Sequence, residues 1–246
     1  MIPKKIHYCW FGGKPLPALA KRCIESWKEV LPEYEIIEWN ETNFDVNAIP
    51  YTSEAYKVQK YAFVSDYARL WIIYNHGGIY FDVDVEVIRP LDTILKSGSF
   101  LGCEGNINNG PLKMHVNPGL GFGAVRNHKL LKEIIDIYNN LHFINLDGSF
   151  NTKTIVAYTT EVLCSYGLKC VSGVQCCADF YIYPRDYFSP KDPVTRDIHL
   201  TQNTHTIHHY DGSWLPKSAR FRQKIKESLN PRLVTFIKSI YRMFKS

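Results

Sequence analysis

The chain has 246 residues and a net charge of +5, with 45% hydrophobic and 22% charged residues, which is typical of a globular protein with one substantial α/β core. The N-terminus lacks the apolar stretch of a signal peptide, and no apolar run approaches the about 20 residues of a membrane-spanning helix, so we expect a cytoplasmic protein. The seven cysteines form no CxxC pair, which argues against a zinc knuckle and indicates reduced thiols.

The first 40 residues predict two strands separated by a helix. Residues 2–11 are rich in aromatic and branched side chains and end at glycines and prolines, which predicts a strand. Apolar residues at helical spacing predict a helix over residues 19–27, which Pro32 ends. Residues 34–39 predict the second short strand.

The next segment joins a helix to a strand with an acidic face. A long amphipathic helix is predicted over residues 53–75, with Gly77-Gly78 as its C-terminal stop. Residues 79–88 then alternate strictly between apolar and polar side chains, which predicts one strand with a buried face. Three acids on the polar face repel one another unless a cation or water lies between them. The polar face consists of Tyr80, Asp82, Asp84 and Glu86.

Asp82 and Asp84 are candidate metal ligands. Two carboxylates at i and i+2 lie about 6–7 Å apart in an ideal strand, so a kink or a bridging water is needed before both can hold one ion. Mn²⁺ and Mg²⁺ prefer oxygen ligands and share them with phosphates. The pair therefore predicts a cation that faces a diphosphate. The alternative is an ordinary solvated strand face without a metal.

Asp66 and Arg69 share one face of the preceding helix, because they are three residues apart. Functionally, Asp66 would accept hydrogen bonds from sugar hydroxyls, and Arg69 would contact the sugar or its phosphate through its planar fork of donors. The alternative is a local surface ion pair worth a few tenths of a kcal/mol.

The second half continues the alternation of strands and helices. Strands are predicted over 99–104, 119–125 and 204–210, and helices over 128–141 and 152–166. Alternating elements indicate an α/β fold with a mostly parallel central sheet flanked by helices. We predict one domain over residues 1–214, followed by a basic tail over residues 215–246.

Three motifs in order resemble the family 32 glycosyltransferases, the sugar-binding-region DXD transferases, which are distantly related to the large clostridial glucosylating cytotoxins. The central motif is the run SDYARLWIIYNHGGIYFDVDVEVIRPLD at 65–92. The chain also opens with Ile-His-x-x-Trp at 6–10 and has His-rich residues followed by Ser-Trp at 208–214. The resemblance spans nearly all of residues 1–214 and implies a GT-A fold, Rossmann-like in its sheet and helices.

The resemblance also implies a role for each matching residue. Trp10 would stack on the nucleobase of a nucleotide-sugar donor, and Asp84 would be the principal ligand of Mn²⁺ or Mg²⁺, assisted by Asp82 and His209, or else His208. The implied catalytic set is Asp66, Arg69, Asp82 and Asp84. The implied donor-binding set is Cys9, Trp10, Phe11, Ser65, Asp66, Arg69, Tyr80, Asp82, Ser213 and Trp214.

An acceptor side is expected around residues 117–123, where glycines permit close approach of a ligand. Asn117 is its candidate contact, and a plain strand with a tight bend is the alternative. The chain departs from the family at 159–161, where Thr-Thr-Glu replaces the Thr-Gly-Pro of many members. Glu161 is a further candidate on the acceptor side.

The tail is strongly basic, with nine Lys or Arg and one acid over residues 215–246. Apolar residues at helical spacing after Pro231 predict a basic amphipathic C-terminal helix suited to an anionic membrane surface. Packing of this helix on the body is the alternative. No nucleic-acid-binding module accompanies the charge, so we expect no nucleic-acid partner.

Taken together, these features predict a retaining, metal-dependent glycosyltransferase. It would transfer a hexose or N-acetylhexosamine, first of all from a UDP-sugar, to a saccharide or lipid-linked saccharide acceptor. Related bacterial enzymes imply a role in capsule, O-antigen or other surface polysaccharide synthesis, peripheral on the inner face of the cell membrane. The alternatives are a toxin-like transferase acting on protein and a metal-dependent phosphoesterase, which also uses clustered Asp and His.

Overall fold

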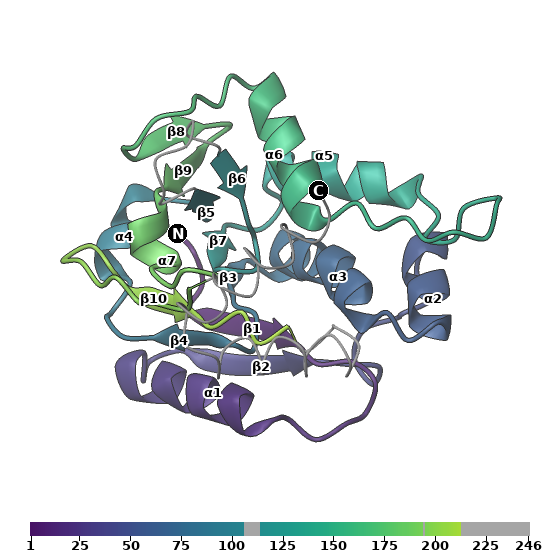
Figure 1. The fold of residues 1–246 in the computed structure, drawn as a ribbon, viewed down its shortest axis with the longest axis horizontal. Coiled ribbons are helices and arrows are strands. Elements are labelled where there is room, and N and C mark those ends of the chain that lie inside the picture. Colours follow the sequence, from purple (N-terminus) through teal and green to yellow (C-terminus); the bar gives the residue numbers. More distant parts are fainter. Residues whose placement is uncertain (106–113, 194, 213–246) are drawn as a thin grey trace, which may run out of the picture.

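An eight-stranded sheet lies at the centre of the computed structural model, which describes residues 1–105, 114–193 and 195–212 (Figure 1). Its strands are β1 (Lys5–Cys9), β2 (Glu35–Trp39), β3 (Gly78–Tyr80), β5 (Phe100–Gly105), β6 (Met114–Val116), β7 (Phe122–Ala124), β8 (Gln175–Cys177) and β9 (Phe180–Tyr183). The order is β2-β1-β3-β7-β5-β9-β8, and β6 pairs with β5. Strands β2, β1, β3, β5 and β9 run in one direction, and β7, β8 and β6 run against them.

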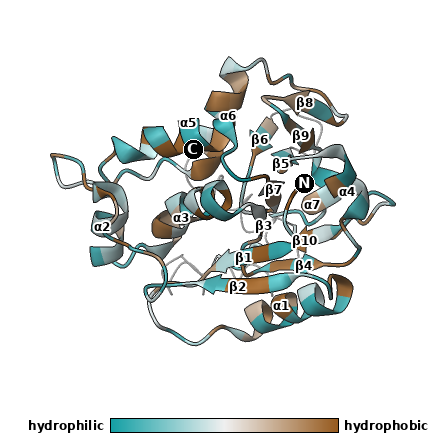
Figure 2. Ribbon diagram, turned by 180° about the vertical axis from the view of Figure 1, so that it is seen from behind, coloured by the Kyte–Doolittle hydropathy of each residue, from teal (hydrophilic) through white to brown (hydrophobic). Residues whose placement is uncertain are grey.

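Helices cover both faces of this sheet (Figures 1 and 2). The helices of one face are α2 (Pro50–Lys57), α3 (Tyr61–His76), α5 (Lys129–Asn139) and α6 (Ile155–Ser165). Those of the other face are α1 (Ala18–Val30), α4 (Asp92–Ser97) and α7 (Arg185–Phe188). The predicted α/β fold with a mostly parallel central sheet flanked by helices is confirmed. Within the described residues, no helix has the length and apolar character needed to cross a membrane.

Two hydrophobic cores lie on the two faces of the sheet. Trp27 of α1 and Phe188 of α7 are fully buried in the core that α1, α4 and α7 cover. Tyr51 of α2 and Tyr138 of α5 are equally buried in the other core and meet edge to face, with ring centroids 5.0 Å apart. The cores are separate because successive strand residues point to opposite faces. The strands that divide them carry hydrophobic residues, seen as brown segments in Figure 2.

The prediction of a single strand over residues 79–88 is wrong, because the structure has two separate strands there. β3 ends at Tyr80, and a turn closed by the hydrogen bond from Val85 N to Asp82 O (3.0 Å) separates it from β4 (Val85–Val87). β4 leaves the main sheet and pairs antiparallel with β10 (Thr206–His208) in a two-stranded sheet. A partner more than 100 residues away therefore redirects the chain at the two aspartates.

The long helix predicted over 53–75 is also two helices. α2 ends at Lys57 and α3 begins at Tyr61, because Gln59 adopts a positive φ of 58° that breaks the helical path. The amide of Lys60 donates to Ala55 O (2.8 Å), which satisfies the last turn of α2 and redirects the chain. The predicted stop at Gly77-Gly78 agrees with the structure.

His7 of β1 connects Trp39 at the end of β2 with Gly77 at the end of α3. Its imidazole is fully buried, Nδ1 accepts the indole N–H of Trp39 (3.0 Å), and Nε2 lies 3.0 Å from Gly77 O. An indole N–H can only donate, so His7 is neutral with its proton on Nε2. A Cβ on Gly78 would lie 2.8 Å from Lys5 O and 3.0 Å from His7 Nε2, so the second glycine allows β3 to pack against this ring.

This ring makes stability depend on pH in a defined direction. Burial lowers the pKa of His7 from 6.5 to about 4, so the unfolded chain takes up the proton first as pH falls. The His7 contribution is complete above pH 6.5 and is lost toward pH 4, with about 2 kcal/mol of it lost between pH 7 and 5. Urea unfolding should therefore show that the difference between the unfolding free energies of wild type and His7→Asn becomes smaller by this amount between pH 7 and pH 5. A difference that does not change with pH would contradict the assignment.

Candidate active site

Asp82, Asp84 and His208 form a compact cluster of possible metal ligands. Ligand atoms from the three residues all lie within 4.8 Å of one another. Asp82 and Asp84 flank the turn between β3 and β4, and β10 brings His208 alongside, opposite Val85. The turn supplies the kink that two carboxylates at i and i+2 need in order to converge.

The histidine in this cluster is His208, which corrects the prediction of His209. His208 Nε2 lies 3.2 Å from Asp84 Oδ1, whereas His209 Nε2 lies 2.7 Å from Glu86 Oε2. Neighbouring residues of a strand point to opposite sides, so only one of the two can face the aspartates. The register of β10 against β4 selects His208.

The chemistry of the cluster suits a divalent cation. Two carboxylates and one imidazole are common ligands of Mn²⁺, and oxygen ligands also suit Mg²⁺. The Nδ1 atom of His208 is buried and has no hydrogen-bond partner among the described residues. Asp84 is held rigidly, because its Oδ2 accepts the amide N–H of Asp211 (2.8 Å). These residues therefore fit the predicted ion.

Charge coupling between Asp84 and His208 favours the ionised form of each. Burial would raise the pKa of Asp84, but His208 and the Asp211 amide outweigh it and hold that pKa far below its usual range. Burial would lower the pKa of His208, and Asp84 raises it instead.

Arg69 lies buried between two carboxylates beside this cluster. Its Nη2 is 3.1 Å from Asp66 Oδ1 and 3.2 Å from Asp82 Oδ1, and its side chain is 6% exposed. Its Nε donates to Ser65 O (3.1 Å), and its guanidinium lies 5.0 Å from the ring centroid of Tyr80. The surface-pair alternative is excluded by this burial, and the expected pairing of Asp66 with Arg69 on α3 is present.

Tyr80 and Asp66 complete the surroundings of Arg69. The hydroxyl of Tyr80 donates to Asp82 Oδ1 (3.1 Å). Burial raises the pKa of Asp66 to about 6 although Arg69 opposes the shift, and burial likewise raises the pKa of Asp82. For Arg69, burial is outweighed by Asp82 and its neighbours, so its pKa is raised and it stays charged. Arg69 therefore fixes the direction in which both carboxylates point.

The predicted donor-binding residues differ in their burial and in their contacts. The Cys9 thiol is buried next to Tyr80, and burial raises its pKa to about 12. Ser65 donates its hydroxyl to Tyr61 O (3.1 Å). Trp10 is partly exposed at the end of β1, and its indole N–H donates to Lys14 O. The side chain of Phe11 packs in the core against Phe44, while the predicted contact with the nucleobase concerns only the backbone of Cys9 and Phe11. The predicted Ser213 and Trp214 lie outside the described residues.

The two predicted acceptor-side residues, Asn117 and Glu161, differ in where they lie relative to the cluster. Asn117 lies beside the cluster, because its Oδ1 accepts the amide N–H of Gly119 (2.7 Å), whose carbonyl accepts from Asp82 N (3.2 Å). Glu161 is 63% exposed on α6 and pairs with Lys153 (2.6 Å). Among the described residues it makes no contact with the aspartates, so its pairing supports a surface role.

Gly119 provides a direct test of how tightly the cluster is packed. A Cβ at this position would lie 2.3 Å from Asp82 Oδ2 and 3.0 Å from Arg69 Nη1, so Asp82 would have to move. Gly119→Ala should therefore weaken Mn²⁺ affinity at least about tenfold, as expected when ligand geometry is disturbed. Isothermal titration measures this. The control Gly173→Ala, where an added Cβ meets nothing within 4 Å, should bind like wild type. Equal affinity in both variants would contradict the geometry.

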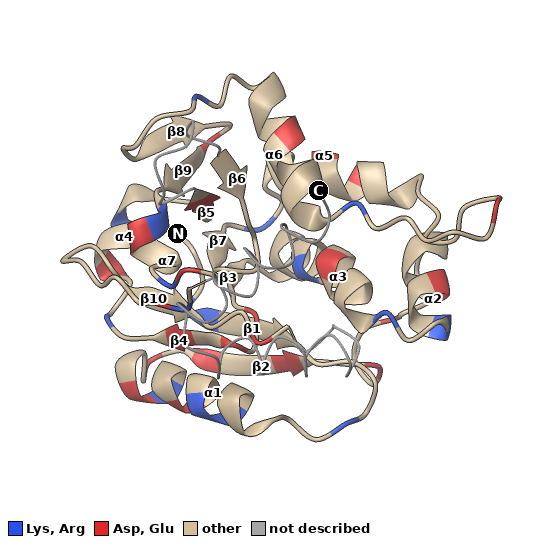
Figure 3. Cartoon of the chain, in the orientation of Figure 1, with Lys and Arg blue, Asp and Glu red and all other residues tan. Residues whose placement is uncertain are grey.

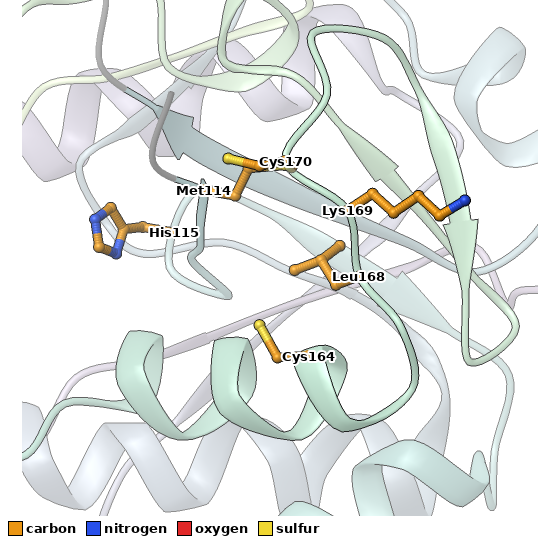
Figure 4. A pocket seen from close by; sticks show the side chains of 6 residues that line it. All are labelled: Met114, His115, Cys164, Leu168, Lys169 and Cys170. Atoms are coloured by element: carbon orange, nitrogen blue, oxygen red, sulfur yellow. The ribbon is translucent and has the colours of Figure 1, made fainter. Parts of the chain in front are cut away.

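A separate pocket of about 260 Å³ opens between β6 and α6 (Figure 4). Among the described residues, its lining is mostly apolar and carries no carboxylate. The lining residues are Met114, His115, Cys164, Leu168, Lys169 and Cys170. Chemistry that requires clustered acids therefore belongs to the site around Asp82 and Asp84 and not to this pocket.

Comparisons with curated proteins find similar mannosyltransferases. Inositol phosphoceramide mannosyltransferase 3 of Schizosaccharomyces pombe (strain 972 / ATCC 24843) is 30% identical over 102 residues, which is 38% of this chain and 27% of that protein. Inositol phosphoceramide mannosyltransferase 1 of the same organism is 26% identical over 111 residues, 41% of this chain and 33% of that protein. The matched region thus spans a third or less of either relative.

A solved structure and a family model agree with the geometry. The chain resembles a glycosyltransferase involved in the glycosylation of the major capsid of PBCV-1, with a TM-score of 0.50, 11% identity, and coverage of 90% of this chain and 98% of that one. This likeness shows the fold alone, and the predicted GT-A arrangement is confirmed. Residues 17–101, which include Asp66, Arg69, Asp82 and Asp84, match the model described as a glycosyltransferase sugar-binding region containing a DXD motif. Within residues 17–101 the chain is therefore similar to the DXD glycosyltransferases.

Proposed function

We propose that this protein transfers a hexose or N-acetylhexosamine from a nucleotide-sugar to a saccharide acceptor, with retention of anomeric configuration. The observation that carries the proposal is the buried Arg69, held between Asp66 and Asp82 and adjacent to the Asp82–Asp84–His208 cluster. A metal-dependent phosphoesterase would use the cluster but has no need of the Asp66–Arg69 pair beside it. Proximity of the two groups therefore favours transfer of a sugar.

In this proposal, different side chains of the site bind different parts of the donor. Trp10, partly exposed at the end of β1, stacks on the nucleobase. Asp66, aligned by Arg69, accepts hydrogen bonds from hydroxyls of the sugar. Tyr80, Asp82 and the adjoining backbone flank the ribose and diphosphate. Mn²⁺ or Mg²⁺ bound by Asp82, Asp84 and His208 would neutralise charge on the departing nucleoside diphosphate.

Retention follows in this proposal from front-face substitution. The buried carboxylate of Asp66 is paired with Arg69, and Asp82 and Asp84 face the cluster, so none of the three is placed as a nucleophile. The leaving diphosphate would take the proton of the acceptor hydroxyl as the new glycosidic bond forms. The residues around it then act mainly by electrostatic stabilisation of the leaving group.

The acceptor is proposed to be a saccharide or lipid-linked saccharide of a bacterial surface polysaccharide. Residues 1–214 would form the catalytic domain, and the basic tail at 215–246 would hold it at an anionic membrane surface on the cytoplasmic side. The support for the tail is its sequence pattern of apolar and basic residues. Its residues lie outside the described part of the chain.

Product analysis tests the proposed function. The protein is incubated with Mn²⁺, a panel of α- and β-hexosides, and UDP-glucose, UDP-galactose, UDP-N-acetylglucosamine or GDP-mannose; the last is included because both curated relatives are named mannosyltransferases. We expect nucleoside diphosphate and a new α-glycoside. Release of phosphate or nucleoside monophosphate would identify a phosphoesterase instead, and a β-linked product would exclude retention.

A further inference from the structure

A second polar network surrounds Glu104 at the end of β5. Its Oε1 accepts a hydrogen bond from Asn117 Nδ2 (3.2 Å), and its Oε2 accepts one from the hydroxyl of Tyr210 (3.1 Å). The Tyr210 hydroxyl also lies 2.6 Å from Ser189 Oγ. Three segments far apart in the sequence therefore fix the position of this one carboxylate.

This network reaches the metal-ligand cluster from two directions. On one side, Asn117 accepts from the Gly119 amide (2.7 Å), and Gly119 O accepts from Asp82 N (3.2 Å). On the other side, the ring of Tyr210 meets the imidazole of His208 edge to face, with centroids 4.2 Å apart. Glu104 is thus connected to both Asp82 and His208.

Charge distinguishes Glu104 from Asn117. The amide of Asn117 donates to Glu104 and accepts from Gly119. A carboxylate has about four lone-pair positions, and the contacts of Glu104 within the described residues use two of them. Glu104 is also only partly buried. Because an ionised carboxylate forms stronger hydrogen bonds than a neutral amide oxygen, Glu104 is the better acceptor for a ligand hydroxyl, and Asn117 holds it in place.

The place of β5 in the sheet indicates which ligand this is. β1, β3 and β5 run in the same direction, so Trp10, Asp82 and Glu104 all lie at the carboxyl ends of their strands, where ligands of such sheets bind. The order is β1-β3-β7-β5, so Glu104 lies beyond the metal-ligand cluster from Trp10. A donor with its base on Trp10 and its diphosphate at the cluster would present its sugar toward Glu104. Figure 3 shows the acidic end of β5 in the middle of the molecule.

We infer that Glu104 accepts a hydrogen bond from a hydroxyl of the acceptor saccharide, and that Asn117 and Tyr210 orient its carboxylate for this purpose. The inference rests on the proposed function, since it assigns the acceptor side of the same site. Glu104, and not Asn117, is then the direct contact of the acceptor, and Asn117 is a positioning residue.

Kinetics of Glu104→Gln test this role. The amide keeps the shape of the side chain but loses the charge that strengthens a hydrogen bond. With the donor and hexoside that wild type uses best, we expect kcat/KM for the hexoside to fall about 10- to 100-fold, chiefly through KM. The dissociation constants of the nucleoside diphosphate and of the intact donor, each measured by titration with Mn²⁺, should stay within about twofold of wild type, and Glu104→Asp should restore part of the loss.

Glu133→Gln is the matched control, because Glu133 of α5 also accepts a tyrosine hydroxyl, from Tyr166 (2.7 Å), away from the site. It should leave every constant unchanged. If Glu104→Gln matches wild type, or weakens binding of the intact donor, the inference is overturned while the proposed function stands. If wild type itself neither binds nucleotide with Mn²⁺ nor transfers sugar, the proposed function fails and this inference fails with it.

Discussion

Replacing Asp84 with alanine is expected to lower the rate of sugar transfer by at least about 100-fold and to abolish saturable Mn²⁺ binding. Asp84 is held in the cluster by His208 (3.2 Å) and the Asp211 amide (2.8 Å). Its removal leaves Asp82, already engaged by Arg69 and Tyr80, and the imidazole as the only described ligands of the set. Initial rates over a range of Mn²⁺ concentrations measure the effect.

Glu86→Ala is the control for this variant. Glu86 is the next acid on the same side of the sequence pattern and is also partly buried, but it pairs with His209 outside the cluster. We expect it to keep the rate and metal affinity of wild type within about threefold, since a half-exposed pair of this kind contributes little. An Asp84→Ala enzyme with near-normal transfer, or equal losses in both variants, would contradict the metal assignment.

Replacing Arg69 with methionine is expected to destabilise the protein by about 3–5 kcal/mol, because it leaves two buried carboxylates without their counter-charge. Asp66 and Asp82 are 11% and 29% exposed at their side chains. Chemical denaturation at neutral pH measures the loss. Activity should fall as well, since Asp66 and Asp82 lose the group that aligns them.

Two further variants test whether the loss of stability in Arg69→Met comes from leaving buried carboxylates unpaired or only from removing a positive charge. Lys132→Met breaks an exposed ion pair with Asp136, in which both side chains are 50% exposed, and should cost no more than about 1 kcal/mol. Asp66→Asn combined with Arg69→Met should be less destabilised than the sum of the single variants, because one uncompensated charge disappears. Additive effects, or an Arg69→Met loss no larger than that of Lys132→Met, would show that Arg69 does not balance these carboxylates.

The parts of the fold that depend on local pattern were predictable from the sequence. Apolar spacing predicted α1, α5 and α6, and short runs of strand-favouring residues predicted β1, β2 and β5, because these elements follow preferences that their own sequences mark. The glycine pair at 77–78 marked the end of α3 for the same local reason. The run at 65–92 also placed Asp66, Arg69, Asp82 and Asp84 near one another, as the structure does.

The parts that depend on distant contacts were not predictable. The alternation at 79–88 suggested one strand, but pairing of β4 with β10 bends the chain at the aspartates. That same register, which no local signal specifies, selects His208 over His209. The short strands β6, β8 and β9 carry too few residues for a clear pattern.

Glu104 was missed for a similar reason. Its segment, FLGCEG, predicts a strand but has nothing that distinguishes its acid from any other at a strand end. Only the contacts with Asn117 and Tyr210, which come from other parts of the chain, mark it. The one available signal was the sheet direction, which places the end of β5 at the same edge as the end of β3.

Anomalous diffraction at the manganese edge, from crystals of the full chain soaked with Mn²⁺ and a nucleoside diphosphate, tests the central claim most directly. We predict one strong peak within coordination distance of Asp82, Asp84 and His208, with both phosphates of the nucleotide beside it. A bound nucleotide without a peak between these residues, or a peak held only by other groups, would contradict the account.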